Sequence, residues 1–515
     1  MTESERPALN VGAGPLSIEE LLLLARGQRR ARLGRNPELR ARIESGRALL
    51  QRAVTRDEAI YGVTTGVGDS VEVRVSPDLV EQLPHNLMRF HGVGTGALLT
   101  DEQSLATVAA RLLSLGRGYS AVRPEVLEAL CDLLVHDIAP CIPAEGSVGA
   151  SGDLTPLSYV AACIAGERKA RVGGRTMDAG QALSQAGLRP LSLLPKESLA
   201  LMNGTSVMGG LSCLAFESSR RLARLSSSLT AMASEVLRGQ PGHFDDRIFE
   251  LKPHPGQRAC ARWIREDLEY EGGGAPEPGR LQDRYSIRCA PHVIGVLMDF
   301  LPLCRQFIEA EINGVNDNPI VDPERGAIYN GGNFYGGHLC FAMDGLKNTV
   351  ANLADLIDRQ LALLCNPATN GGLPANLCGA RGAEARVNFG FKAAQITTSA
   401  LAAEALKLTM PASVFSRSTE NHNQDKVSMG TIAARDCLRI IELTETAAAI
   451  HLLALCQAAE LRQLEVCHGR SRALHAAVRA RVPFVERDRA MDVDIAAVLE
   501  LYRRDALPIG EVDWA

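Results

Sequence analysis

The chain has 515 residues, which at roughly 150 residues per domain corresponds to about three domains. Its 55 Lys and Arg residues and 60 Asp and Glu residues give a net charge of −5, so composition predicts no general attraction to nucleic acid or to a membrane surface. Hydrophobic residues make up 46% and charged residues 22%, which excludes a disordered, collagen-like or purely coiled-coil chain. Aromatic residues reach only 4% while Ala and Leu dominate, which favours helices.

The cysteines and the termini point to a cytoplasmic enzyme or binding protein without a metal. Thirteen cysteines with no C-x-x-C pair fit neither a disulfide framework nor a zinc ribbon. The N-terminus lacks a basic segment followed by an apolar one, so no secretory signal is predicted. The longest uncharged run, residues 198–216, contains Asn203 and several glycines, which indicates a buried core near a site rather than a membrane span.

The first half of the chain alternates helices with polar loops. Apolar spacing predicts an amphipathic helix that begins after Ser17 and a basic helix over residues 39–54. A helical pattern over residues 77–139 is interrupted by Pro, Gly and Ser over residues 140–156, and a buried helix follows. The pair Gly173-Gly174 predicts a hairpin, which is the only convincing β segment.

The second half is dominated by long helices. They are predicted at residues 196–239, 286–313, 338–365, 390–410 and 430–465, with a short helix at 492–502. Residues 270–280 have the composition of an exposed connection. We therefore predict a mainly α fold with a long central helical bundle, divided into an N-terminal domain (1–200), the bundle (201–465) and a helical tail (466–515).

One glycine-rich turn before a predicted helix can build its own electrophile. It is not a nucleophile elbow, because Asp153 stands where the last glycine is needed, and it is not a P-loop, because no Lys follows the glycines. Gly152 has no side chain, so its nitrogen can approach the Ala150 carbonyl in a strained turn. Attack closes a five-membered imidazolone ring, and loss of water and of the Ser151 hydroxyl leaves an exocyclic methylene.

Three motifs in order give the chain a recognisable resemblance. The run Gly149-Ala-Ser-Gly-Asp-Leu-Thr-Pro, followed by Leu201-Met-Asn-Gly-Thr-Ser and Asn316-Asp-Asn-Pro, strongly resembles the aromatic amino acid ammonia-lyase and aminomutase family, which includes histidine, phenylalanine and tyrosine ammonia-lyases. The resemblance extends from about residue 60 to about residue 461. It implies the fumarase/aspartase-like ammonia-lyase fold, with a 4-methylidene-imidazol-5-one (MIO) group formed from Ala150-Ser151-Gly152 in the N-terminal domain.

The same resemblance implies a homotetramer, with sites built from three subunits, and assigns the catalytic residues. Tyr61, in a glycine-rich loop that would otherwise be a plain surface loop, becomes the catalytic base on a mobile lid. A phenol with a pKa near 10 needs that pKa lowered to serve as a base, and we expect helix ends and Arg288 to lower it. The planar fork of Arg288 is expected to hold the substrate carboxylate.

Further residues are expected around this centre. If residues 282–288 are helical, Gln282, Tyr285 and Arg288 share one face, and the resemblance places Tyr285 among the catalytic residues and Gln282 in the same pocket. Asn203, Asn333 and Phe334 are expected near the prosthetic ring.

The pair Phe90-His91 occupies the substrate-selecting position of the family and departs from its common patterns. Phenylalanine lyases usually have Phe-Leu there, one group of tyrosine lyases has His-Leu, and histidine lyases and a second tyrosine group have Ser-His. Phe90 favours a phenyl ring, whereas His91 favours a hydrogen bond to a phenol or an imidazole.

Four other positions bear on the substrate. Gln424 stands where histidine lyases typically have Glu, which disfavours histidine. Glu420 and Lys392 match positions typical of phenylalanine lyases. Ile396 stands where some tyrosine aminomutases have Tyr, which weakens the case for a phenol.

The leading hypothesis is an MIO-dependent ammonia-lyase that converts L-phenylalanine or L-tyrosine to the trans-cinnamate or coumarate plus ammonia. A 2,3-aminomutase would use the same residues, and a histidine ammonia-lyase is a further alternative. A non-catalytic helical scaffold has no reason to keep the ring-forming triplet with Tyr61, Asn203, Tyr285 and Arg288. A serine hydrolase is weaker still, because no His or Asp pairs plausibly with Ser151.

Overall fold

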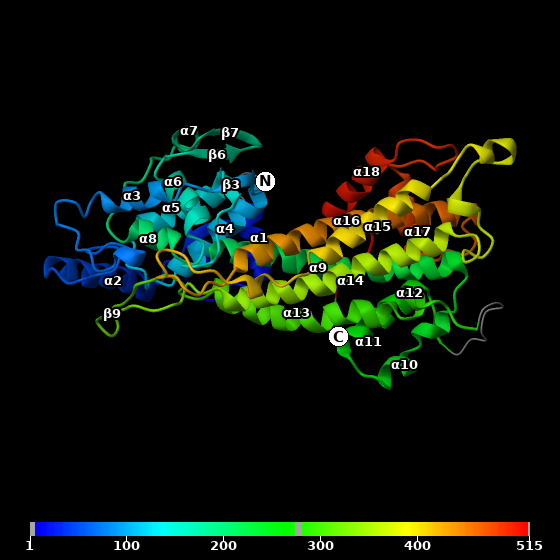
Figure 1. Cartoon of the computed structure of the whole chain (residues 1–515), viewed down its shortest axis with the longest axis horizontal. Coiled ribbons are helices and arrows are strands. Elements are labelled where there is room, and N and C mark those ends of the chain that lie inside the picture. Colours follow the sequence, from blue (N-terminus) through cyan, green and yellow to red (C-terminus); the bar gives the residue numbers. More distant parts are fainter. Residues whose placement is uncertain (1–5, 273–280, 513–515) are drawn as a thin grey trace. The chain divides into compact units, whose positions relative to one another are not determined.

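The computed structural model describes residues 6–272 and 281–512, most of them in helices (Figure 1). The chain forms two compact units. Unit 1 comprises the residues up to Glu217 together with Leu303–Asp344 and Pro411–Arg435. Unit 2 comprises Ser218–Pro302, Gly345–Met410 and the residues from Asp436 onward.

Four long helices contribute residues to both units, so every unit boundary except the one at Met410–Pro411 falls inside a helix. They are α9 (Ser206–Leu237), α13 (Ala290–Ile312), α14 (Gly337–Cys365) and α16 (Gly430–Leu461). The compact units therefore divide the chain differently from the three consecutive segments expected from sequence. The physical reason is that long helices leave no linker at which composition could change.

Unit 1 holds eight α-helices besides its parts of the long ones, together with all the strands of the described residues. The helices are α1 (Ile18–Ala25), α2 (Pro37–Thr55), α3 (Leu83–Phe90), α4 (Asp101–Leu115), α5 (Pro124–Val135), α6 (Leu154–Ile164), α7 (Ala179–Gln185) and α8 (Glu197–Met202). Helix α1 begins as predicted at Ser17, whose side chain and that of Glu20 form a reciprocal capping box. The same arrangement of Thr100 and Gln103 opens α4.

The strands of unit 1 are short and form four small sheets. They are β1 (Ala8–Val11), β2 (Arg30–Leu33), β3 (Thr95–Leu98), β4 (Ala139–Pro140), β5 (Pro143–Glu145), β6 (Lys169–Val172), β7 (Arg175–Asp178), β8 (Ile320–Asp322) and β9 (Ala327–Tyr329). β1 and β2 pair in parallel, and the β3–β5, β4–β6–β7 and β8–β9 sheets are antiparallel. The hairpin predicted at Gly173-Gly174 is confirmed as β6–β7, but the expectation that it is the only β segment is wrong. Strands of two to four residues are too short to show an alternating pattern.

Unit 2 consists of helices and loops. Besides its parts of the long helices it contains α10 (Asp246–Glu250), α11 (Pro255–Asp267), α12 (Tyr285–Arg288), α15 (Lys392–Lys407), α17 (Gly469–Arg479) and α18 (Asp492–Arg503). The predicted connection at 270–280 falls mostly on residues 273–280, outside the described residues. The mainly α fold class is confirmed.

A polar network joins the long helices in the core of unit 2. Gln360 on α14 donates to Thr230 on α9 at 2.9 Å and contacts His451 on α16 at 3.2 Å. Gln360 also donates to the main-chain oxygen of Ser286 at 2.8 Å, which fixes α12 against the bundle. Burial lowers the pKa of His451 to about 3, so this imidazole is neutral.

Two findings bear on membranes and cysteines. Among the described residues, one helical stretch, Tyr285–Ile312, is long and apolar enough to span a membrane by length and composition; 50% of its apolar window is buried, and a core helix passes the same test. The cysteines are all free thiols, and all are buried except Cys289 and Cys378, which are half-buried. No group of three or more His, Cys, Asp or Glu side chains in the described part of the chain is arranged to hold a metal ion.

Candidate active site

The ring-forming triplet lies in the loop between β5 and α6, and Asp153 anchors that loop. The Asp153 carboxylate is fully buried; it accepts hydrogen bonds from Ser147 Oγ at 2.9 Å, from Thr431 Oγ1 and from the Met208 amide at 2.9 Å. Burial raises the pKa of Asp153, and these donors oppose that shift. The loop is thereby tied to the first turns of α9 and α16.

Gly152 is pressed against the backbone of Gly204. Its φ is +71°, and a Cβ built on it would lie 2.2 Å from the Gly204 carbonyl oxygen. The same oxygen accepts a hydrogen bond from the Asp153 amide at 2.7 Å. Only glycine fits this position, both in conformation and in space.

Polar side chains contact Ser151 at two points. Asn203, at the C-terminal end of α8, donates from Nδ2 to the Ser151 carbonyl at 3.3 Å, while its own Oδ1 is buried without a partner. Gln424 Nε2 donates to Ser151 Oγ at 3.1 Å. The carbonyl of Ser151 would be the carbonyl of an imidazolone ring, so Asn203 already stands where it would withdraw electron density from that ring. The residues present therefore fit an MIO group.

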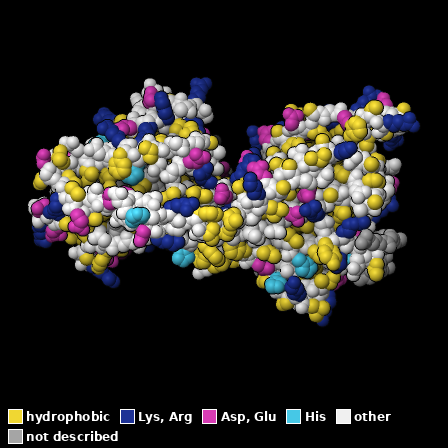
Figure 2. All heavy atoms as spheres, in the orientation of Figure 1, with side chains coloured by type: hydrophobic (Ala, Val, Ile, Leu, Met, Phe, Trp, Pro, Cys, Tyr) yellow, Lys and Arg dark blue, Asp and Glu magenta, His cyan; other side chains and the backbone are white. Residues whose placement is uncertain are grey.

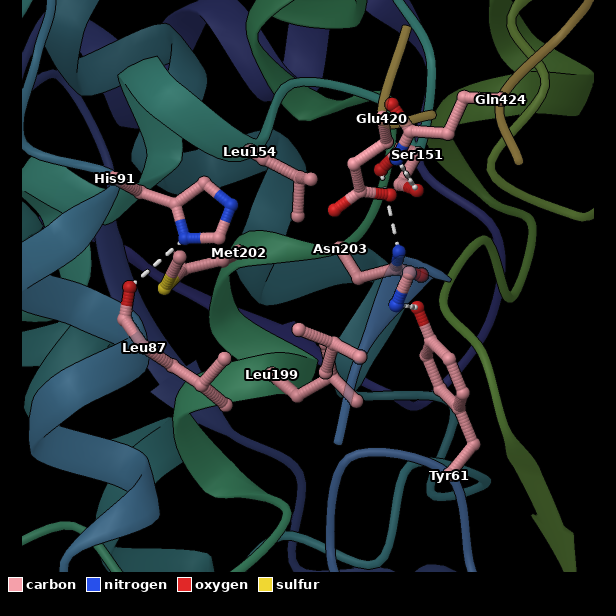
Figure 3. Close-up of a pocket in the computed structure, with 12 residues that line it drawn as sticks. Tyr61, Leu87, His91, Ser151, Leu154, Leu199, Met202, Asn203, Glu420 and Gln424 are labelled. Carbon is pink, nitrogen blue, oxygen red and sulfur yellow. Dashed lines mark hydrogen bonds between the residues drawn. The ribbon is translucent and has the colours of Figure 1, made fainter. Parts of the chain in front are cut away.

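These groups border a narrow cavity that is partly open to solvent, with an empty volume of about 330 Å³ that includes solvent at its mouth (Figure 3). The space in which the centre of a water molecule can move is only about 10 Å³, about enough for one water. An amino acid therefore enters only when a bordering loop moves. The cavity is lined by Tyr61, Val67, Gly68, Leu87, His91, Ser151, Leu154, Leu199, Met202, Asn203, Glu420 and Gln424.

Tyr61 is held with its hydroxyl oxygen accepting the Gly68 amide at 2.9 Å. Burial raises the pKa of Tyr61 above its usual value of 10, and the charge of Glu420 raises it further, whereas the Gly68 amide lowers it. Within unit 1, burial therefore outweighs the lowering expected for the pKa of Tyr61, and the effect of Arg288 in unit 2 stays a prediction. The Gly68 amide is the group here that stabilises a phenolate.

His91 presents one ring nitrogen to the cavity. Its Nδ1 lies 2.8 Å from the Leu87 carbonyl, which can only accept, so Nδ1 carries the proton. Burial lowers the pKa of His91, so the ring is neutral and Nε2 is an acceptor that points away from Leu87 into the cavity (Figure 3). The ring of Phe90 lies 3.9 Å from that of His91, between centroids. Phe90 is 54% exposed and is not among the lining residues, so only one member of the predicted selecting pair lines this cavity.

Arg288 and Tyr285 belong to unit 2. Arg288 Nε donates to the Asp283 carbonyl at 3.0 Å, and the guanidinium lies 4.7 Å from the centroid of the Tyr285 ring. These contacts fix the orientation of the Arg288 guanidinium, whose two terminal nitrogens can together bind both oxygens of a carboxylate. The helix expected over 282–288 is shorter: α12 begins at Tyr285, so Gln282 precedes it and is not on its face.

The remaining predicted residues do not line the cavity. Asn333 is exposed and donates from Nδ2 to the Val315 carbonyl at 3.0 Å; Phe334 is half-buried beside it in the loop before α14. In unit 2, the ammonium of Lys392 lies 5.7 Å from the centroid of the Phe389 ring, and Ile396 is 61% exposed.

Two buried charged residues behind the site were not predicted. Asp153 was considered only as a mismatch to another motif. Arg111 on α4 is 0% exposed and donates from Nη1 to the Asn203 carbonyl at 2.9 Å. A lone arginine inside the otherwise apolar run Val108-Ala-Ala-Arg-Leu-Leu was the signal that could have revealed it.

Comparisons with known proteins agree with this geometry. Residues 16–480 match the aromatic amino acid lyase family. The chain is 37% identical to a histidine ammonia-lyase of Koribacter versatilis, covering 97% of this chain and 98% of that protein. It is 38% identical to a tyrosine ammonia-lyase of Cupriavidus metallidurans, covering 96% and 95%. The crystal structure of tyrosine aminomutase from Streptomyces globisporus superimposes with a TM-score of 0.90 at 32% identity, covering 98% of both chains.

The fold and these comparisons define a carbon–nitrogen lyase. The chain belongs to the aromatic amino acid lyase family, the MIO-dependent ammonia-lyases and aminomutases, whose members act on free amino acids as small-molecule substrates. The predicted ammonia-lyase fold is thereby confirmed, and the interpretation as a non-catalytic scaffold is set aside.

Proposed function

We propose that this chain is an MIO-dependent ammonia-lyase that eliminates ammonia from L-tyrosine or L-phenylalanine, giving coumarate or cinnamate, with L-tyrosine preferred. The observation that carries the proposal is a cavity with Ser151 at one end and the neutral acceptor nitrogen of His91 at the other (Figure 3). Leu154, Leu199 and Met202 lie between these ends.

This arrangement matches a phenol ring. The ring of tyrosine has apolar faces and one hydrogen-bond donor at its far end, and His91 Nε2 needs one donor. Phenylalanine would leave that nitrogen unpaired in a buried site, which costs affinity. An imidazole could also donate to His91, but its second nitrogen would then lie among apolar side chains.

The chemistry divides between the prosthetic group and the chain. The MIO group formed from Ala150-Ser151-Gly152 supplies an electrophilic methylene that makes the substrate nitrogen a good leaving group. Asn203 withdraws electron density through the Ser151 carbonyl. Tyr61 removes the β-proton of the substrate, with its phenolate held by the Gly68 amide.

Arg288 binds the substrate carboxylate, and we propose that it does so across a homotetramer in the cytoplasm. Large apolar side chains reach solvent on both units (Figure 2), and surfaces of this kind mark interfaces. Examples of such exposed side chains are Val296, Phe341, Val387, Phe389, Ile396, Val414 and Phe415.

Two other activities have a specific observation behind them. Histidine ammonia-lyases are prominent among the relatives, and His91 could accept from an imidazole as well as from a phenol. An aminomutase is favoured by the fold neighbour from Streptomyces globisporus, and a narrow cavity would slow the escape of ammonia before re-addition.

A substrate panel tests the proposal. The purified chain is incubated with Tyr, Phe, His and DOPA, and chromatography separates acrylates from β-amino acids. We expect coumarate as the main product, with kcat/KM for Tyr exceeding that for Phe by more than about tenfold. A dominant urocanate or β-amino acid product would replace the proposed function by one of the other two.

The variant His91→Leu tests the selecting contact. Removing the acceptor should reverse the preference towards phenylalanine, because the cavity end becomes apolar. His85→Leu, a histidine on the same helix that does not line the cavity, is the control. An unchanged ratio of the two kcat/KM values in His91→Leu would reject His91 as the selector.

A further inference from the structure

We propose that Arg111 is a positioning residue for the closure of the ring at Ala150-Ser151-Gly152, an inference that rests on the proposed function. Arg111 does not line the cavity and acts through the peptide that joins Asn203 to Gly204. It lies in the middle of α4 with its whole side chain buried.

Arg111 holds one side of that peptide. Its Nη1 donates to the Asn203 carbonyl at 2.9 Å, and its Nη2 donates to Ser114 Oγ at 3.1 Å. Ser114 Oγ in turn donates to Asn316 Oδ1 at 3.1 Å. A Cβ built on Gly204 would lie 2.0 Å from Arg111 Nη1, so the guanidinium and this glycine are in direct contact.

The next peptide along the chain, from Gly204 to Thr205, supports the ring-forming loop. The Gly204 carbonyl accepts the Asp153 amide at 2.7 Å and lies 2.2 Å from the position of a Cβ on Gly152. Arg111, Gly204 and Gly152 therefore form three layers with no room for a side chain between them. We therefore expect a displacement of Arg111 to displace Gly152 as well.

Ring closure depends on both ends of this stack. The Gly152 nitrogen bonds to the Ala150 carbonyl carbon, and that oxygen leaves as water with the hydrogens of the Gly152 and Ser151 nitrogens. The Ser151 hydroxyl leaves as a second water with the Ser151 Cα hydrogen, and no oxidant is needed. The stack sets the place of Gly152, and the hydrogen bond from Asn203 Nδ2 to the Ser151 carbonyl makes the Cα hydrogen more acidic.

Stability alone gives little reason to keep an arginine here. Its Nε is buried without a partner, and a buried guanidinium is costly to desolvate. Burial lowers the pKa of Arg111 to about 10, and the charges of Asp317 and Asp153 only partly offset this. Apolar packing of similar volume is often as stable as a buried charge, so its presence next to the ring-forming stack indicates a role in that chemistry.

The test follows ring closure directly, without an activity assay. Wild-type, Arg111→Met and Arg111→Lys chains are made by cell-free synthesis, synthesis is stopped, and intact mass is sampled over time for the loss of two waters. Thermal unfolding and circular dichroism are measured on the same samples. The control is Arg224→Met: Arg224 is also buried, and its bonds go to Asp267 and Ser228 in unit 2. Arg470 still pairs with Asp267 in this control.

We expect Arg111→Met to close the ring about tenfold or more slowly, as loss of a charged hydrogen bond in the rate-determining arrangement implies. Arg111→Lys, which keeps the charge and one donor, should lie between. Arg224→Met should lose stability but close the ring at the wild-type rate. A folded Arg111→Met chain that closes at the wild-type rate overturns the inference.

The remaining outcomes are also decisive. If Arg111→Met fails to fold, Arg111→Lys carries the test, and wild-type closure in it overturns the inference. Failure of both to fold shows a purely structural role and equally contradicts it. A wild-type chain that never loses two waters overturns the proposed function itself, which separates that failure from failure of the role of Arg111.

Discussion

The predicted catalytic residues divide between two regions that differ in how they are held. In unit 1, Ser151, Asn203 and Tyr61 are bound to other groups of the same unit and enclose a cavity that admits about one water. In unit 2, Tyr285 is 72% exposed, and Arg288 is held by the hydrogen bond from its Nε and by its contact with the Tyr285 ring. The first region is organised for chemistry within its own unit, whereas the second offers binding groups at a surface.

Ser151→Ala should have the largest effect, because it removes the hydroxyl whose loss as water forms the exocyclic methylene. We expect the mass deficit of two waters to disappear and activity to be nearly abolished. Ser158→Ala is the matched control, since Ser158 is buried in α6 and donates to the Thr155 carbonyl within the same helix. An active Ser151→Ala enzyme would contradict the MIO assignment.

Tyr61→Phe should come next, with kcat reduced by about 10²–10⁴-fold, as is usual for loss of a general base. The two waters should still be lost, since the phenol is not part of the triplet. Tyr159→Phe removes a similar contact, a hydroxyl that accepts the Gly94 amide at 3.2 Å outside the cavity, and should change kcat little. Near-normal turnover in Tyr61→Phe would show that another residue removes the β-proton of the substrate.

Arg288→Lys probes the unit 2 region and should act mainly on binding. An ammonium cannot reproduce the two-pronged contact of a guanidinium with a carboxylate, so KM should rise by about tenfold or more, with the two waters still lost. Arg284→Lys, just before α12, is the control. A fall in kcat without a change in KM would show that Arg288 acts on the chemical step and not on substrate binding.

Glu420→Gln should give the smallest effect, a shift in pH dependence. The charge of Glu420 raises the pKa of Tyr61, so removing it lowers that pKa and forms the phenolate at lower pH. The rising limb of the pH profile of kcat should move to lower pH by less than about one unit, measured between about pH 7 and pH 11. A shift to higher pH would show that Glu420 does not act on Tyr61 through its charge.

Sequence motifs predicted the polar and glycine-rich residues of the site, but not the apolar residues that line its cavity. The triplet, Asn203 and Tyr61 stand in rare combinations of small and polar residues, so they could be found. Leu87, Leu154, Leu199 and Met202 are ordinary core residues of three different helices, and nothing in their types distinguishes a cavity wall from packing.

The electrostatics could not be predicted from motifs either. The pKa of Tyr61 depends on its burial and on the groups that surround the phenol in space, and in unit 1 these include Gly68 and Glu420. The expected effect of Arg288 stays a prediction. Likewise, the neutral state of His91 follows from its burial and from the Leu87 carbonyl one turn earlier, neither of which residue identity reveals.

The buried thiols can report the local unfolding of the part of the chain that covers them. Burial raises the pKa of Cys163 and Cys456 to about 12, so almost no reactive thiolate exists in the folded protein at neutral pH. On exposure each thiol returns to a pKa of about 8.5 and becomes open to alkylation. Labelling in unit 1 at Cys163 and in unit 2 at Cys456, read by peptide mass, therefore times the local unfolding of each unit separately.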